Sequence, residues 1–443
     1  MVYNIAMLSL GCPKNLTDAE TMLALLEKEN YNIVSDAGDA DVIIVNTCGF
    51  IEAAKQESID ALLEMAEYKN DRCKLLIATG CLAERYNEQI IEQIPEVDAV
   101  IGTGDFHKIA EVINTCFQNS TYKPCLYGHI DFTPDVTDRK ISTPQYVAYI
   151  KISDGCDNRC TYCAIPYIRG KYRSRPMEDI VAEAKKLAES GVKELILIAQ
   201  DTTRYGKDIY GKYSLARLLK ELCRIEPLKW IRLHYLYTEA ITDELIDTIA
   251  SEDKICKYID MPIQHADDNI LKRMARRSDS RQIEEVVNKL RAKIPGVCIR
   301  TTVIVGFPGE TDKEFDTLYK FMRKMKFDRA GVFAYSQEEG TPAAKFDNQV
   351  DDEIKQQRYD SLMRLCMGIS HEKNKSKLGS ELTVLTEGYD EESYLYYGRS
   401  EADSIDIDSK VYFAAMHDVE AGEFVNVEIL DCDEFDLTGK VKY

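Results

Sequence analysis

The 443-residue chain lacks the features that mark membrane and secreted proteins. No uninterrupted apolar stretch approaches the ~20 residues that a membrane-spanning helix needs. The first residues, MVYNIAMLSLG, have neither a basic region nor a small-residue cleavage site, so we do not expect a signal peptide or a membrane partner. The 14 cysteines then indicate metal ligation and free thiols in a reducing cytoplasm, and not a disulfide framework.

Positive charge is also scarce, since 56 Lys and Arg face 76 Asp and Glu, a formal net charge of −20. The imbalance is greatest in residues 379–443, where 17 acidic side chains oppose 4 basic ones, a formal charge of −13. A protein that binds nucleic acid through phosphates normally carries basic patches. An acidic surface instead favours a basic partner, which we expect to meet Asp403, Asp406 and Asp408, although acidity that serves only solubility is the simpler alternative.

Three cysteines stand in a compact pattern: Cys156, Cys160 and Cys163 have the spacing CxxxCxxC. Three thiolates at this spacing can bind three corners of a four-iron cluster and leave the fourth iron open to a small molecule. A zinc site would need a second CxxC or a histidine pair nearby, and neither is present. The remaining alternative is three small buried thiols on a turn.

Three further cysteines, Cys12, Cys48 and Cys81, each follow the carboxyl end of a different predicted strand. Those strands, together with a fourth, are expected at residues 3–9, 41–47, 75–79 and 97–102. Because helices alternate with them, the pattern predicts a doubly wound parallel α/β sheet, whose ligands bind at the carboxyl edge. The three thiols could hold a second cluster there, or they could be independent buried cysteines. In the helix after the first strand, we expect Asp18 or Thr17 to be the N-cap.

Residues 117–145 hold three prolines and little apolar periodicity, and we interpret them as a linker. The strand–helix alternation then resumes, with strands expected at 146–152, 194–199, 230–235, 258–261, 298–305 and 331–335. Six units are too few for a closed eight-stranded barrel, so we expect a partial (β/α)6 barrel that is open on one side. A helix over 351–377 leaves it, and short alternating strands from residue 379 predict a small OB-like β-barrel.

A basic stretch follows the CxxxCxxC loop and contains Arg169, Lys171, Arg173 and Arg175. It is either a solvated loop or a contact for the carboxylate of a cosubstrate or substrate.

The CxxxCxxC loop, with Tyr162 before its last cysteine, resembles the radical S-adenosylmethionine (SAM) enzymes. In that superfamily the open iron binds the amino and carboxylate groups of SAM, and reductive cleavage yields a 5′-deoxyadenosyl radical. The segments SLGCPKN, NTCGF and ATGC make the resemblance narrower, because they are similar to the methylthiotransferases. Those enzymes carry an additional cluster on an N-terminal domain and a TRAM domain at the C-terminus.

The resemblance implies a domain division and a set of site residues. Residues 1–116 would be the methylthiotransferase domain, 146–378 the radical SAM core with its connecting helix, and 379–443 the TRAM domain. Both cysteine triads would be catalytic and would hold a [4Fe-4S] cluster each. The cofactor-binding residues that we expect are Tyr162, flanking the adenine of SAM, and Gln200, Gly306 and Arg175.

SLGCPKN followed by Asp18-Ala19-Glu20 resembles the branch that methylthiolates C3 of an aspartate in small-subunit ribosomal protein twelve. The resemblance implies that protein as partner, on the ribosome, together with an electron donor and a sulfur donor. A transfer RNA methylthiotransferase is an alternative, which the acidic C-terminal region disfavours. A non-catalytic iron–sulfur scaffold or redox sensor is a second alternative, and turnover of SAM would separate it from either enzyme.

Overall fold

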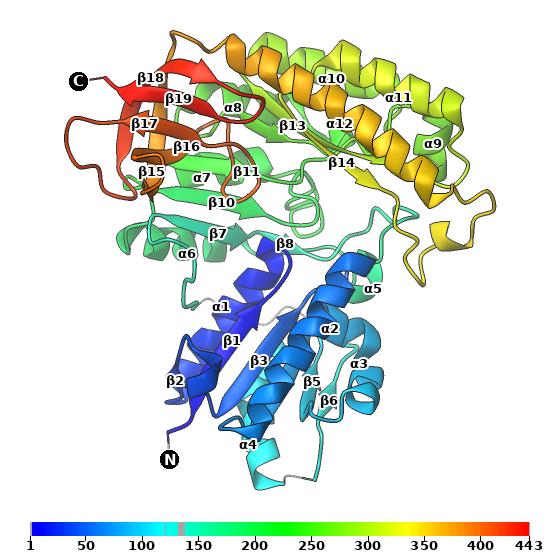
Figure 1. Ribbon diagram of the computed structural model, residues 1–443, viewed down its shortest axis with the longest axis vertical. Coiled ribbons are helices and arrows are strands. Elements are labelled where there is room, and N and C mark those ends of the chain that lie inside the picture. Colours follow the sequence, from blue (N-terminus) through cyan, green and yellow to red (C-terminus); the bar gives the residue numbers. More distant parts are fainter. Residues whose placement is uncertain (1, 120, 132–137, 443) are drawn as a thin grey trace.

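The computed structural model describes residues 2–119, 121–131 and 138–442. Figure 1 shows three parts: an N-terminal α/β domain at the bottom, a larger central α/β part above it, and a small β-barrel at the upper left. The predicted linker 117–145 includes residues 120 and 132–137, which lie outside the described residues.

The N-terminal sheet has six strands in the order β2-β1-β3-β4-β5-β6, and all its pairings are parallel. Its strands are β1 (Asn4–Ser9), β2 (Asn32–Ile33), β3 (Val42–Thr47), β4 (Leu75–Gly80), β5 (Ala99–Ile101) and β6 (Cys125–Leu126). Its helices are α1 (Pro13–Lys28), α2 (Glu52–Ala66), α3 (Cys81–Gln93) and α4 (Ile109–Gln118). Alternate residues of β3 pack against α2 and α3 on one face and against α1 and α4 on the other, so the predicted doubly wound sheet is confirmed.

Two expectations for this domain were wrong in detail. Helix α1 begins at Pro13 with Cys12 as its N-cap residue, so Thr17 and Asp18 lie inside the helix. Proline suits a first helical position because it has no N–H to leave unpaired there. The segment interpreted as a linker also contributes β6, whose Cys125 pairs with Val100 at the edge of the sheet.

The central part contains six parallel strands: β7 (Val147–Lys151), β10 (Glu194–Ile198), β11 (Trp230–Leu233), β12 (Tyr258–Asp260), β13 (Cys298–Val305) and β14 (Arg329–Ala334). They form two three-stranded sheets, which the isolated bridge between Ile231 and Ile255 connects. The predicted partial barrel is therefore confirmed. A short antiparallel pair, β8 (Ser153–Asp154) with β9 (Arg173–Ser174), flanks the cysteine loop and was not predicted.

Helices cover the outside of this partial barrel and bury one continuous apolar core against its strands. They are α6 (Met177–Glu189), α7 (Leu215–Cys223), α8 (Asp243–Ser251), α9 (Asp268–Arg273), α10 (Ser280–Lys293), α11 (Asp312–Met325) and α12 (Asp352–Lys375). The short helix α5 (Ile165–Ile168) instead follows the cysteine loop and packs against Cys81 at the start of α3. In Figure 1, α12 runs along the top of the molecule and leads into the C-terminal barrel.

The C-terminal barrel is closed, with strand order β15-β16-β17-β19-β18. Its strands are β15 (Glu381–Asp390), β16 (Leu395–Ser400), β17 (Val411–Ala414), β18 (Phe424–Cys432) and β19 (Leu437–Val441). Strand β19 was missed because its sequence, LTGKV, is short and contains a glycine. That glycine is required, since a Cβ on Gly439 would lie 2.3 Å from the Glu428 carbonyl oxygen.

Buried charges fix the C-terminal barrel against the inner side of the central strands. Glu194 on β10 has no exposed side-chain surface and binds both Arg232 (2.7 Å) and Arg399 (2.6 Å), the latter from β16. Arg329 on β14 pairs with Asp403 at 2.7 Å. Apolar contacts accompany these pairs, including Trp230 against Phe424. One side of the C-terminal barrel is therefore buried against the central part.

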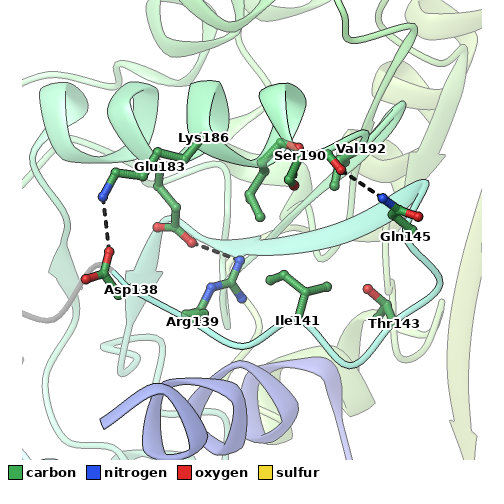
Figure 2. Close-up of a pocket in the computed structure, with 10 residues that line it drawn as sticks. Asp138, Arg139, Ile141, Thr143, Gln145, Glu183, Lys186, Ser190 and Val192 are labelled. Atoms are coloured by element: carbon green, nitrogen blue, oxygen red, sulfur yellow. Dashed lines mark hydrogen bonds and ion pairs between the residues drawn. The ribbon is translucent and has the colours of Figure 1, made fainter. Parts of the chain in front are cut away.

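The segment that enters β7 ties the N-terminal domain to the central barrel (Figure 2). Arg139 pairs with Glu20 of α1 at 3.0 Å and with Glu183 of α6 at 2.8 Å. Asp138 binds Lys186 at 3.1 Å beside a cavity of about 590 Å³. These contacts hold α1 close to the start of the barrel. Among the described residues, no helix is both long and apolar enough to cross a bilayer.

Candidate active site

The CxxxCxxC loop follows β8 at the carboxyl ends of the barrel strands. Cys156 and Cys160 are buried, Cys163 is half-buried, and the Cys163 N–H donates to the Cys160 carbonyl at 3.0 Å. Burial raises the pKa of Cys156 to about 12 and also raises that of Cys163, which lies near the other two thiols. Such thiols lose their protons when a cation compensates the thiolate charge, which is what iron ligation supplies.

Cys12, Cys48 and Cys81 follow β1, β3 and β4, which are neighbours in the sheet. The loops approach closely: a Cβ on Gly11, whose φ is +85°, would lie 2.7 Å from the Cys48 Cβ. The structure therefore brings these cysteines to one edge of the sheet, as the sequence predicted. We call them the auxiliary triad, and Cys156, Cys160 and Cys163 the radical triad.

Helix N-termini and cations surround the auxiliary triad. Cys12 is the N-cap residue of α1, and Cys81 is the first residue of α3, so both thiols lie where helix dipoles favour negative charge. Burial alone would raise the pKa of Cys12, but Lys14 and Arg169 outweigh burial and hold it below the usual value. Burial raises the pKa of Cys81 to about 12, although Arg169 opposes the shift.

A buried ion network joins the two triads across the domain interface. Arg169 lies between Asp18 of α1, at 2.8 Å, and Asp154, at 3.2 Å. Lys151 binds the same two carboxylates, at 2.5 and 3.1 Å. Asp154 stands two residues before Cys156, and Arg169 Nη2 lies 3.8 Å from Cys81 Sγ. The two sites therefore share one charged interface.

Each triad supplies three cysteine thiolates as its donor set. Among residues 2–119, 121–131 and 138–442, no three His, Cys, Asp or Glu side chains are grouped as ligands of one metal ion. A four-iron cluster takes one thiolate at each of three corners. The residues present fit that group.

Gln200 is close to the radical triad through Asp154, to which its Nε2 donates at 3.0 Å. Its Oε1 is buried and has no hydrogen-bond partner among the described residues, so an acceptor is left beside the loop. Gly306, with φ +71°, lies after β13, but a Cβ there would meet the side chain of Lys355 at 2.3 Å. The space beside Gly306 is thus filled by the protein itself.

Tyr162 packs at the edge of an apolar cluster with Met274 and Phe307. Burial, followed by the nearby Cys160, raises the pKa of its hydroxyl. Arg175, in contrast, donates to the Lys151 carbonyl at 2.8 Å and pairs with Glu183 at 2.6 Å. Its guanidinium already has protein partners in β7 and α6.

The basic stretch after the cysteine loop does not act as one unit. Arg169 is buried at the domain interface, whereas Arg173 donates to the Arg169 and Lys171 carbonyls and lies near Asp131. Arg169 is therefore not part of a solvated loop, whereas Lys171 is exposed.

Sequence reasoning missed a second arginine beside a cysteine. Arg276, after α9, has Nη1 4.0 Å from Cys160 Sγ, donates to the Pro262 carbonyl at 3.0 Å and lies over the Tyr237 ring. No sequence signal marks it, because it is about 110 residues from the loop and its neighbours are also basic.

A second interface contact was also missed. Glu338, in the loop after β14, accepts from the Glu52 N–H at 2.8 Å and pairs with Lys55 (3.2 Å) and Arg85 (3.4 Å). The N-terminal domain therefore contacts both ends of the strand series, near β7 and after β14.

Comparison with known proteins first identifies the class of protein to which the chain belongs. The pattern of the "Radical SAM superfamily" matches residues 150–322, "Uncharacterized protein family UPF0004" matches 4–102, and "TRAM domain" matches 378–441. The cobalamin-binding radical SAM methyltransferase TsrM from Kitasatospora setae has the same fold, with a TM-score of 0.59 at 15% identity over 77% of each chain. The radical SAM enzyme OxsB gives 0.54 at 13% identity, over 81% of this chain and 56% of that chain. The fold is that of a radical SAM enzyme with a TRAM domain.

Sequence relatives define the particular family. The chain is 51% identical to "Ribosomal protein uS12 methylthiotransferase RimO" of Acetivibrio thermocellus, over 100% of this chain and 99% of that protein. It is 52% identical to the protein of the same name in Clostridioides difficile, with the same coverage. The chain belongs to the ribosomal protein uS12 methylthiotransferase family, and the predicted resemblance is confirmed.

Proposed function

We propose that this protein methylthiolates C3 of an aspartate in ribosomal protein uS12, using SAM and two [4Fe-4S] clusters. The observation that carries the proposal is the meeting of two cysteine triads at one buried interface, in a chain about 50% identical to relatives named for uS12 methylthiolation. A C–H bond without an acidic proton gives a general base nothing to abstract, so a radical route is needed.

The cysteines would divide the work. Cys156, Cys160 and Cys163 would hold the cluster that, when bound, supplies the electron for reductive cleavage of SAM. Cys12, Cys48 and Cys81 would hold the second cluster and present the sulfur that is transferred. The two networks around Arg169 and Glu338 would keep the two sites in register, because each one joins the N-terminal domain to the barrel through buried ion pairs.

The other predicted site residues receive unequal support. Gln200 offers an unpartnered Oε1 next to the loop, and Tyr162 presents an apolar ring there, as contact with a nucleoside would need. Gly306 and Arg175 have protein neighbours in the positions where a cofactor contact was predicted. We therefore assign SAM contact first to Gln200 and Tyr162.

We also propose the domain division that the resemblance implies: residues 1–116 form the methylthiotransferase domain, 117–145 the linker, 146–378 the radical SAM core and 379–443 the TRAM domain.

Substrate choice would depend on charge. The expectation that Asp403 and Asp408 face a basic partner is wrong, because the side chains of both are buried. Asp403 binds Arg329, and Asp408 lies near Arg300 and accepts from the Tyr258 hydroxyl. Exposed carboxylates such as Asp406, Glu391 and Glu392 remain available on the C-terminal barrel. They would attract a basic ribosomal protein, on the ribosome in the cytoplasm, and repel RNA phosphates.

Mass spectrometry of uS12 and of transfer RNA from cells lacking this protein tests the substrate. We expect uS12 to lose its methylthio group, transfer RNA to keep its own, and a plasmid copy to restore the first. Loss of the methylthio group from transfer RNA, with uS12 unchanged, would move the assignment to the transfer RNA enzyme. The proposal also includes an electron donor and a sulfur donor.

A further inference from the structure

Each cysteine triad has one arginine beside one of its sulfurs. Arg169 Nη2 lies 3.8 Å from Cys81 Sγ in the auxiliary triad, and Arg276 Nη1 lies 4.0 Å from Cys160 Sγ in the radical triad. The two differ in surroundings, because Arg169 is only 2% exposed whereas Arg276 is half-buried. Charge at Arg169 is therefore less screened by water.

Arg169 is fixed from both domains. Its Nη1 binds Asp18 of α1 at 2.8 Å and Asp154 at 3.2 Å, while its Nη2 lies 3.4 Å from Asn15 Oδ1 and faces Cys81. Two carboxylates thus orient Nη1, and Asn15 and the Cys81 thiol share Nη2.

Two further cations lie near Arg169. Lys151 pairs with the same two carboxylates, Asp18 and Asp154. The buried Lys14, whose Nζ lies 3.5 Å over the Tyr235 ring, lies near Cys12, while Glu57 is an acidic side chain near Cys48. Of these charged groups, Arg169 contacts a sulfur of the auxiliary triad.

We propose that Arg169 is a positioning residue that compensates negative charge at the auxiliary site and makes a cluster held there easier to reduce. A fixed positive charge beside a cluster stabilises its more negative, reduced form, and charge and hydrogen bonds to the sulfurs set the potential. This inference rests on the proposed function, since it requires a cluster on Cys12, Cys48 and Cys81.

The test uses the full chain with Cys156, Cys160 and Cys163 replaced by Ala, so that only the auxiliary triad can hold a cluster. Arg169→Met removes the charge, Arg169→Lys keeps it, and Arg276→Met is the matched control, because it removes the corresponding arginine from the other triad. Iron content and the midpoint potential, from a redox titration followed by electron paramagnetic resonance, are measured after anaerobic reconstitution.

We expect Arg169→Met to shift the midpoint to a more negative potential, Arg169→Lys to recover most of the shift, and Arg276→Met to leave it unchanged. A fully loaded Arg169→Met protein with an unchanged potential would overturn this inference and leave the two-cluster proposal intact. No iron in the parent triple variant would overturn both. If Arg169→Met binds no iron, Arg169→Lys decides: normal iron and potential support the role of the charge, and loss of both overturns it.

Discussion

At the scale of single residues, the two cysteine triads lie beside buried charged side chains, among them Arg169 and its partners Asp18 and Asp154. The radical triad could be predicted because CxxxCxxC is a local spacing, and the auxiliary triad because each member follows a strand. The ion pairs of Arg169 with Asp18 and Asp154 could not be predicted, because these residues come from separate segments that meet only where the two domains dock. Only docking of α1 against the barrel buries Asp18.

The iron content of a cysteine variant tests the residue-level assignment. The intact chain should bind about eight irons after anaerobic reconstitution if each triad holds a four-iron cluster. Replacing Cys156, Cys160 and Cys163 by Ala should leave about half of that iron, measured by colorimetric assay. Replacing Cys116, Cys223 and Cys366, which lie outside both triads, should leave all of it. Full retention in the first variant contradicts the assignment.

At the scale of elements, most strands and helices followed from apolar patterns, and the exceptions have physical reasons. The strand expected at 298–305 is β13 itself, because all of its residues except Arg300 are β-branched or apolar. Strands β6 and β19 were missed because two-residue and glycine-containing strands carry almost no pattern. These segments become strands because they pair with other strands, β6 with β5 and β19 with β17 and β18.

The loop after β14 gives the prediction at this scale. Glu338→Ala removes the carboxylate that Lys55, Arg85 and the Glu52 N–H share, leaving buried cations without it. Breaking a buried ion pair from one side typically costs about 3–5 kcal/mol. We expect a lower urea midpoint and faster proteolysis between the N-terminal domain and the barrel. The exposed neighbour Glu339→Ala is the matched control, because it removes only a 3.4 Å contact with the Tyr86 hydroxyl. Equal effects of the two changes would contradict the role of Glu338.

At the scale of the whole molecule, the C-terminal barrel serves two purposes. Its inner side carries Arg399 and Asp403 into the central barrel, and its outer side carries exposed acidic residues. The sequence predicted the acidity but not its division, because charge counts do not distinguish a buried carboxylate from an exposed one. The formal charge of −13 for residues 379–443 therefore overstates the negative charge that a binding partner would contact.

Acid should loosen this interface. Burial by itself raises the pKa of Glu194, but Arg399 and Arg232 outweigh burial and lower it from 4.5 to about 2. Because the folded pKa is depressed, the stabilisation is fully present above pH ~4.5 and is lost as the pH falls towards 2. The wild-type urea midpoint should fall across that window. Glu194→Gln should already be destabilised at pH 7 and fall less, while Glu391→Gln should follow the wild type; identical curves for all three would contradict the assignment.

The central claim is that the two triads divide one reaction, and a single assay of the auxiliary triple variant tests it most directly. The reconstituted enzyme with Cys12, Cys48 and Cys81 replaced by Ala is incubated with SAM, a reductant and small ribosomal subunits. 5′-Deoxyadenosine and the mass of uS12 are then measured. We predict 5′-deoxyadenosine within a few-fold of the wild-type amount and no methylthio group on uS12, because the cluster that would hold the transferred sulfur has lost its cysteine ligands. Methylthiolated uS12 from this variant would contradict the account.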